Sequence, residues 1–416
     1  MYETSLGKSL LRMAFALMAG ASLFGMASTA RAGDTVLYSF CNATNCTDGE
    51  GPVGVLFKTT TKLYGTTAAG GQYGNGTVFS VNLNGTGYTV LHSFGSIAND
   101  GENPSAGVIK IGNRLYGTAE DGGQFAEGII YSVKTNGTGY TVLHSFDGNA
   151  HDGVFPMAGL VDVGGTLYGT TIGGGGGSGP NCTGCGTVFE IQPSGTGYQI
   201  AYSFCSVANC TDGTNPLAGR LIDVNGTLYG TASGGGTSSL GAVYSLVPCG
   251  SPPCAEQVLY SFSGSPDGKA PWSGVTYKSI DNVGYLYGTT TAGGTNGYGT
   301  VFSVVLCGSP PCAETWRYSF AGAPGDGWTP YGDLLAWGSY MYGTTIMGGA
   351  SNAGTVFKVA ANELSGESLV YSFGGSPDGG VPNAGLVRIG SELYGTTGDG
   401  GNTACSGGCG TVFSIP

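Results

Sequence analysis

Apolar and polar residues alternate along this chain in short runs, and glycine or asparagine separates one run from the next. Residues 106–146 contain four such runs, which read AGVIKI, RLYGTA, GIIYSV and YTVLHSF. Runs of this length that are rich in Val, Ile, Thr and Tyr are typical of β-strands, and the intervening GN and NGTG segments favour hairpin turns. Apolar side chains occur on both alternating faces, as Val78 and Phe79 show, which suits sheets covered on both sides. The pattern predicts four antiparallel strands in a unit that packs between two neighbours.

This unit recurs seven times, and each copy carries the same four landmarks. LYGT or MYGT has its tyrosine at positions 64, 116, 168, 229, 287, 342 and 394. DGxxP begins at positions 48, 100, 152, 212, 267, 326 and 378, and the (Y/H)SF motif has its phenylalanine at 40, 94, 146, 204, 262, 320 and 373. A GTVF-like motif begins at 76, 128, 186, 241, 299, 354 and 410. About fifty residues with four antiparallel strands is the size of a propeller blade. We therefore predict an all-β, seven-bladed β-propeller with blades near residues 48–94, 100–146, 152–204, 212–262, 267–320, 326–373, and 378–416 plus 33–40.

The two ends of the chain predict how the ring closes. The sequence finishes with CGTVFSIP, directly after the third strand of the seventh unit, while TVLYSF at 35–40 precedes the first complete unit. If Val36–Phe40 pairs with Gly410–Ile415, it becomes the fourth strand of the last blade and removes two open sheet edges. We therefore expect residues 33–416 to form one domain with its termini side by side.

Residues 1–32 are typical of a secretory signal peptide. Lys8 and Arg12 precede an apolar stretch at Met13–Met26, and ARA at 30–32 matches a cleavage site. No second apolar run follows, so we expect no membrane span. We also expect no C-terminal anchor, and hence a protein that is exported and either secreted or periplasmic.

Charge narrows the range of partners. The net charge is −12, and residues 33–416 alone carry −14 because the leader contributes +2. An acidic chain is a poor ligand for nucleic acid or an anionic membrane. We expect no nucleic-acid partner, no cofactor and a monomeric state.

The 12 cysteines form six close pairs, and an even number in an exported protein favours disulfides. The expected pairs are Cys41/Cys46, Cys182/Cys185, Cys205/Cys210, Cys249/Cys254, Cys307/Cys312 and Cys405/Cys409. A metal site would need more ligands than these local pairs offer, since only CTGC has CxxC spacing and the histidines at 92, 144 and 151 are remote from it. We therefore expect no metal.

Units that read LYGTTxxGGxxxxGTVFxxxxxGxxxxLYSF resemble the GloVer-type tandem repeat of exported bacterial proteins. The resemblance extends over residues 33–416. It implies a secreted or surface-attached, propeller-like repeat protein, and it brings no catalytic residues with it.

The aspartate of DGxxP occurs in every unit, which favours a structural role. An Asp-Gly pair makes a turn in which the carboxylate accepts backbone N–H groups. A calcium site would need several oxygen ligands converging on one ion, which one aspartate per blade does not provide.

A binding site is expected where the repeats differ. Trp272 and Tyr331 occupy the same position, after the DGxxP proline, in adjacent units. Trp328 lies in the loop that leads to Tyr331, and Asp333 stands where other units have an apolar residue. These aromatic rings could stack on sugar rings while Asp333 accepts hydroxyl hydrogen bonds. The alternative is that they fill space between the fifth and sixth blades.

Three functions remain open. The first is a non-enzymatic binding propeller for an extracellular polysaccharide or protein. The second is a glycan hydrolase or lyase that uses two loop carboxylates from Asp333, Glu102, Glu120 and Asp121. The third is a structural ring for protein interactions, and the fold alone does not decide among them.

Overall fold

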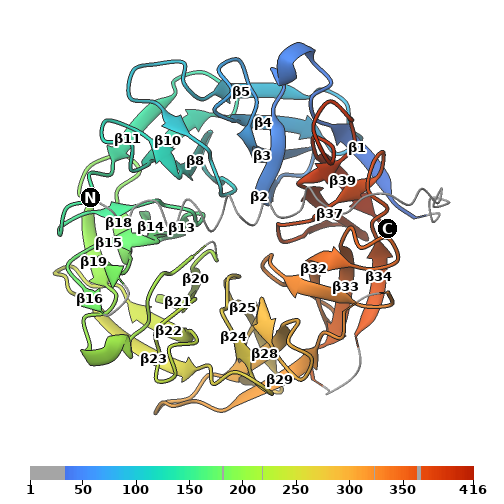
Figure 1. Cartoon of the computed structure of the whole chain (residues 1–416). Helices are drawn as coiled ribbons and strands as arrows, with labels where there is room; N and C mark the ends of the chain where they lie inside the picture. Colours follow the sequence, from blue (N-terminus) through green and yellow to red (C-terminus); the bar gives the residue numbers. More distant parts are fainter. Residues whose placement is uncertain (1–32, 180–181, 218, 323, 363–366) are drawn as a thin grey trace.

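The computed structural model describes residues 33–179, 182–217, 219–322, 324–362 and 367–416. The predicted signal peptide lies outside this range and stays a prediction. Within it, seven sheets of four main antiparallel strands form a ring around one axis (Figure 1). The predicted seven-bladed β-propeller is therefore confirmed.

The blades follow one another in chain order, each running from its innermost to its outermost strand. Blades one and two contain β2 (Glu50–Lys58), β3 (Lys62–Ala69), β4 (Thr77–Asn82) and β5 (Thr89–Ser93), then β7 (Ile109–Ile111), β8 (Arg114–Ala119), β10 (Ile129–Lys134) and β11 (Thr141–Ser145). Blades three and four contain β13 (Val161–Val163), β14 (Thr166–Thr171), β18 (Thr187–Ile191) and β19 (Gln199–Ser203), then β20 (Ile222–Val224), β21 (Thr227–Ala232), β22 (Ala242–Val247) and β23 (Ala255–Ser261). Blade five contains β25 (Thr276–Ile280), β26 (Val283–Thr290), β28 (Thr300–Val305) and β29 (Glu314–Ser319). Blade six contains β31 (Leu335–Trp337), β32 (Tyr340–Gly348), β33 (Thr355–Ala360) and β34 (Ser368–Ser372), with β30 (Gly327–Pro330) also on β32. Blade seven contains β36 (Val387–Ile389), β37 (Glu392–Thr397), β39 (Thr411–Ile415) and β1 (Thr35–Ser39).

The ring closes as the sequence predicts. Strand β1 pairs antiparallel with β39, with Ser39 opposite Thr411, and the Phe40 amide donates to the Gly410 carbonyl at 3.0 Å. Figure 1 shows the first and last strands of the chain side by side in one blade. The seventh sheet therefore combines both ends of the described chain.

Short two-stranded ladders bring the DGxxP loops and the Gly-rich loops after LYGT to one face. Four blades have such a ladder: β6 (Gly101–Glu102) with β9 (Asp121–Gly122), β12 (Gly153–Val154) with β15 (Gly173–Gly174), β24 (Gly268–Lys269) with β27 (Ala292–Gly293), and β35 (Gly379–Gly380) with β38 (Asp399–Gly400). We call this side of the ring the loop face.

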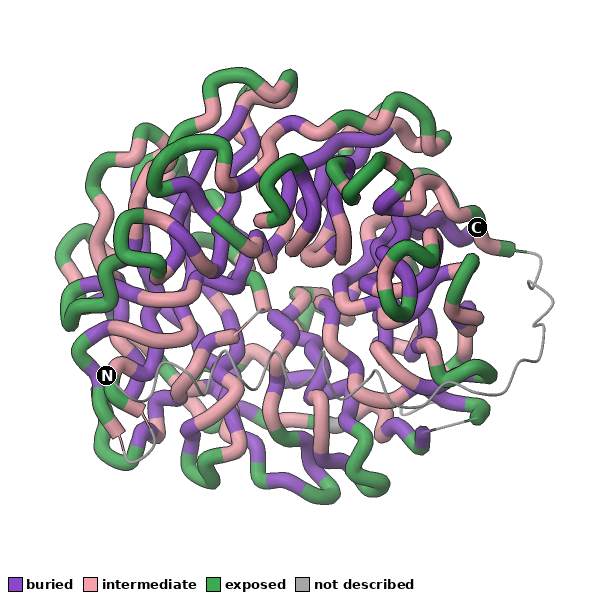
Figure 2. The backbone as a smooth tube through the Cα atoms, turned by 45° about the horizontal axis from the view of Figure 1, so that its top comes forward, coloured by how far each residue is buried: buried purple, intermediate pink, exposed green. Residues whose placement is uncertain are grey.

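The hydrophobic core lies between blades, and the buried segments run through the middle of each blade while the connecting loops are exposed (Figure 2). All seven phenylalanines of the (Y/H)SF motif are completely buried. Phe40, for example, packs edge-to-face on Phe79 of the next blade at 5.2 Å between ring centroids. The motif therefore recurs because each blade junction needs the same large apolar side chain.

The LYGT threonine and the DGxxP aspartate also fasten neighbouring blades. Thr66 of blade one donates to the Ala106 carbonyl of blade two at 2.7 Å. Asp48 accepts from the Tyr38 hydroxyl of blade seven at 2.7 Å and from the Asn42 amide at 2.9 Å. The aspartate thus holds a turn and bonds the previous blade's outer strand, so both motifs have a structural explanation.

Close approach of the innermost strands explains a glycine in the segment after DGxxP. A Cβ at Gly107 of blade two would lie 2.0 Å from the Val55 carbonyl oxygen of blade one. No side chain fits at that distance. The equivalent Gly159 has its nearest atom at 3.6 Å, so the blades are not equally close around the ring.

Candidate functional site

A cavity of about 490 Å³ lies at the axis of the ring on the loop face. All seven blades contribute to its wall, through the segment that follows the DGxxP proline in each. Its wall includes Val53, Ser105, Met157, Arg220, Trp272, Tyr331 and Asn383, one from each blade in turn. A volume of this size is typical of small-ligand sites.

One side of the cavity is aromatic. Trp272 of blade five and Tyr331 of blade six meet edge-to-face, with ring centroids 5.3 Å apart and planes at 74°. Both side chains are half-buried and border the cavity. The two residues occupy equivalent positions in adjacent repeats, and the structure brings their rings together at the axis. The pair can pack against a planar or cyclic ligand.

Asp333 lies beside this pair and has a partner in the neighbouring blade. Its Oδ1 accepts a hydrogen bond from the Gly274 amide at 2.7 Å. Burial raises the pKa of Asp333, while the positive charge of Arg220 and the Gly274 hydrogen bond lower it. Asp333 is therefore partly committed to holding blades five and six together.

Arg220 was missed by the sequence argument. It lines the axial cavity and also a second cavity of about 330 Å³, which is bordered by the inner strands of blades one to four. The sequence does contain a feature that points to Arg220. The segment between the DGxxP proline and LYGT, in which Arg220 stands, is one residue longer in blade four than in blades one, two, three, six and seven. Arg220 gives the cavity a positive group close to Asp333.

Asn383 stands at the position equivalent to Trp272 and Tyr331 and lines the cavity. Its Oδ1 atom has almost no accessible surface and accepts no hydrogen bond from the described residues. A buried acceptor without a donor is costly. Because this atom is not open to the cavity, a ligand hydroxyl reaches it only if the side chain turns.

Glu120, one of the loop carboxylates considered for catalysis, is buried. It is only 6% exposed, and its carboxylate accepts from Ser105 Oγ at 2.7 Å and from Asn103 Nδ2 at 2.9 Å. Ser105 and Asn103 both line the cavity, so Glu120 orients two polar side chains of its wall. By contrast, Glu102 is exposed.

Trp328 lies apart from the other aromatic candidates. Its ring meets Tyr298 of blade five edge-to-face at 5.5 Å, and its Nε1 donates to Asn352 Oδ1 at 3.1 Å. It is not among the residues that line the axial cavity. Trp328 thus belongs to the loops outside the cavity, while Trp272, Tyr331 and Asp333 line it.

The structure joins all 12 cysteines in the six predicted disulfides. Four of these disulfides form two adjacent pairs. In each pair the four sulfur atoms lie within 4.8 Å of one another; the two groups are Cys41, Cys46, Cys405 and Cys409, and Cys182, Cys185, Cys205 and Cys210. The sequence shows only pairs that are close along the chain, whereas the structure brings two such pairs together in each cluster. The expectation of no metal stays a prediction.

The model of the Gloeobacter/Verrucomicrobia repeat matches residues 20–182 and 177–413. The chain belongs to this repeat family. No curated protein sequence matches this member of the Gloeobacter/Verrucomicrobia repeat family. Among its described residues, no helix has the length and apolar character needed to cross a bilayer.

Solved structures share the fold of this repeat-family protein. A puromycin-hydrolysing peptidase of Mycobacterium tuberculosis aligns with a TM-score of 0.51 and 10% identity, over 87% of this chain and 52% of the peptidase. An oligogalacturonate lyase in complex with manganese aligns with a TM-score of 0.50 and 11% identity, over 94% of this chain and 99% of the lyase. At these identities the likeness shows the propeller fold alone.

Proposed function

We propose that this protein is an exported, non-enzymatic binding propeller that recognises the end of an extracellular polysaccharide in its axial cavity. The observation that carries the proposal is the pair of Trp272 and Tyr331 rings beside the charged side chains of Arg220 and Asp333 in one cavity. A sugar ring presents an apolar face that packs on aromatic rings and hydroxyl groups that hydrogen-bond with charged side chains.

The charges of the cavity favour a neutral sugar. Two carboxylates, Asp333 and Asp399, line the cavity together with the single guanidinium of Arg220. The rest of the chain is acidic, with a net charge of −12. Long-range repulsion therefore opposes polyanionic glycans. We expect neutral polysaccharides to be retained better than anionic ones, and the difference to shrink in high salt.

The test is retention of the protein on a panel of insoluble and soluble polysaccharides, with release of sugar products followed in the same samples. Trp272→Ala should abolish retention because it removes one face of the aromatic pair. Trp328→Ala is the matched control, since it removes the same kind of side chain outside the cavity, and it should be retained like the parent protein.

Equal loss in both variants, or full retention of Trp272→Ala, would contradict the assignment to the axial cavity. Release of products by the parent protein would favour the glycan hydrolase or lyase, with Asp333 and Asp399 as the carboxylates to test first. Circular dichroism of both variants shows that the propeller is intact, so that a loss of retention reports on the site.

A further inference from the structure

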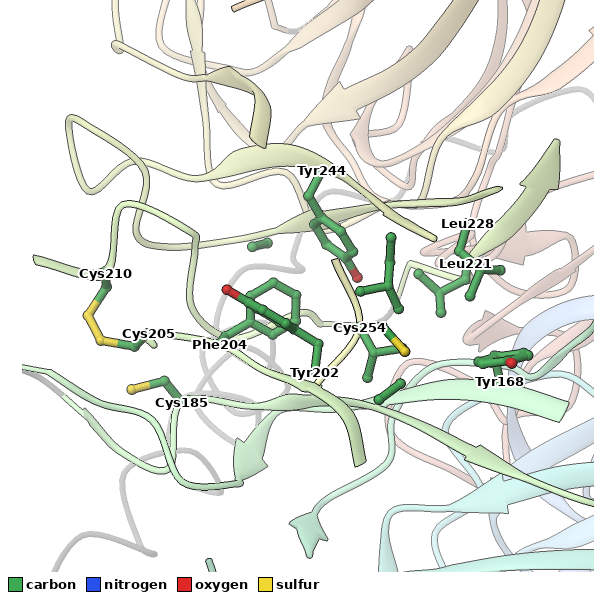
Figure 3. Close-up of a cluster of buried hydrophobic side chains, with 14 residues drawn as sticks. Tyr168, Cys185, Tyr202, Phe204, Cys205, Cys210, Leu221, Leu228, Tyr244 and Cys254 are labelled. Carbon is green, nitrogen blue, oxygen red and sulfur yellow. A yellow bond between two sulfur atoms is a disulfide. The ribbon is translucent and has the colours of Figure 1, made fainter. Parts of the chain in front are cut away.

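The two four-cysteine clusters occur at the same place in two different blades. In blade seven, Cys405 and Cys409 precede β39, and Cys41 and Cys46 follow β1. In blade three, the corresponding pairs precede β18 and follow β19; these cysteines are Cys182, Cys185, Cys205 and Cys210. Figure 3 shows three cysteines of the second cluster, with Cys185 beside the Cys205–Cys210 disulfide.

The two pairs of each cluster also occur together in the sequence. SFC-x4-CTDG is present only at 203–213 and 39–49, and C-x2-CGTVF or C-x3-CGTVF only at 182–189 and 405–413. The other five units have neither pair at these positions. Four ligands of one site must occur in the same blade, and these two blades are the ones that carry both pairs.

The backbone of the two loops is the same. In the 3-10 turns η1 (Thr44–Cys46) and η2 (Ala208–Cys210), the central asparagines have φ of 57° and 60°. The cysteines also match: Cys41 and Cys46 have φ of 56° and 53°, while Cys205 and Cys210 have 59° and 52°. Left-handed backbone is uncommon for cysteine, so its occurrence at both cysteines of both loops marks one specific loop structure that the chain uses twice.

The sulfur atoms are close enough for one metal ion. Four thiolates at about 2.3 Å from a tetrahedral Zn²⁺ lie about 3.8 Å from one another. In the structure, Cys41 Sγ and Cys405 Sγ are 3.4 Å apart although 364 residues separate them. In the second cluster, a Cβ at Gly179 would lie 2.3 Å from Cys210 Sγ and 2.7 Å from Cys205 Sγ, so only glycine leaves room for the sulfur atoms.

We propose that each four-cysteine cluster is a tetrathiolate Zn²⁺ site in the reduced protein, and that the adjacent disulfides are the oxidised form of the same eight ligands. Reduction of one cluster takes four electrons and four protons from two equivalents of a dithiol, which becomes two cyclic disulfides, and yields four thiols. Binding of Zn²⁺ then releases the four thiol protons. The ion would join the loop after the outermost strand of a blade to the loop before its third strand. Each of the two disulfides, by contrast, closes only its own loop.

The experiment begins with the full-length mature protein reduced by excess phosphine without oxygen and titrated with Zn²⁺ or Co²⁺. We expect two ions per chain, one for each cluster, and for Co²⁺ the absorption of tetrahedral thiolate coordination. Cys405→Ser/Cys409→Ser should lower the stoichiometry to one. Cys249→Ser/Cys254→Ser is the matched control, because that disulfide stands outside both clusters, and it should leave two ions bound.

Alkylation followed by mass spectrometry gives a second readout. Zn²⁺ should slow the alkylation of the eight cluster cysteines relative to the metal-free reduced protein, and it should leave the rates at Cys249, Cys254, Cys307 and Cys312 unchanged. The folded reduced chain should also bind the ions more tightly than the same chain in urea. Absence of stoichiometric binding, equal loss in the control variant, or binding no tighter than in urea would overturn the proposal.

Discussion

Blades four, five and six each carry a half-buried glutamate beside an aspartate, a pair that should make the propeller less stable as the pH rises. Six residues before the phenylalanine of (Y/H)SF, blades one to three have tyrosine, whereas blades four, five and six have Glu256, Glu314 and Glu367. Each glutamate lies beside the DGxxP aspartate of its junction. Burial, together with repulsion from Asp212, raises the pKa of Glu256 to about 8. Burial and the corresponding aspartates likewise raise the pKa of Glu314 and of Glu367 to about 8.

The sign follows from proton binding. Between a pKa of 4.5 in the unfolded chain and about 8 in the folded one, the folded protein keeps a proton that the unfolded chain has lost. The free energy of unfolding therefore decreases with pH through this window, and these groups cause no further change with pH below or above it. Each group contributes at most about 1.4 kcal/mol per pH unit. Because the three side chains are partly exposed, we take about half of this, or about 2 kcal/mol per pH unit together.

The assay is thermal unfolding from about pH 5.5 to 8, followed by circular dichroism. For a chain of this size about 2 kcal/mol corresponds to a decrease in Tm of roughly 2–3 °C per pH unit. The triple variant Glu256→Gln/Glu314→Gln/Glu367→Gln keeps the shape of the side chains and removes their titration, so its Tm should be nearly constant over this range. The reasoning is refuted if the parent Tm rises with pH, or if the triple variant keeps the parent slope.

Further predictions concern the blade junctions, each checked by urea denaturation. Gly107→Ala should destabilise the protein by about 3 kcal/mol or more because its Cβ would clash with a carbonyl oxygen. Gly159→Ala, whose Cβ would have its nearest atom at 3.6 Å, should be neutral or stabilise the protein by up to about 1 kcal/mol. Similar losses in both variants would contradict this. Phe40→Ala should cost about 3–5 kcal/mol, since Phe40 is fully buried at the ring closure, and a loss below about 1 kcal/mol would speak against closure through β1. Asp333→Ala should cost about 1–3 kcal/mol by leaving the neighbouring amide unpaired, while Asp333→Asn, which keeps an acceptor, should restore most of it.

The sequence repeat by itself determines the architecture. Seven copies of four landmarks, together with an unpaired first strand and a missing last one, predict the blades and the closure that β1 and β39 form. This works because each blade contains its own strand pairings, which are local in sequence and recur with the same hydrophobic pattern. The shared structural roles of the LYGT threonine and the DGxxP aspartate became clear only from their hydrogen bonds to a neighbouring blade.

Only the tertiary structure decided which side chains meet. Trp272 and Trp328 are both prominent in the sequence, yet one lines the axial cavity and the other packs against Tyr298 in an outer loop. Cys41 and Cys405 lie at opposite ends of the chain and are neighbours in space. The physical reason is that ring closure sets the distances between blades, and the loops that meet across a junction are unrelated in sequence position. Strand order could be predicted from the repeat, whereas the cavity depends on how the blades pack around the axis. The acid pairs and the four-cysteine clusters depend on which segments of one blade meet in space.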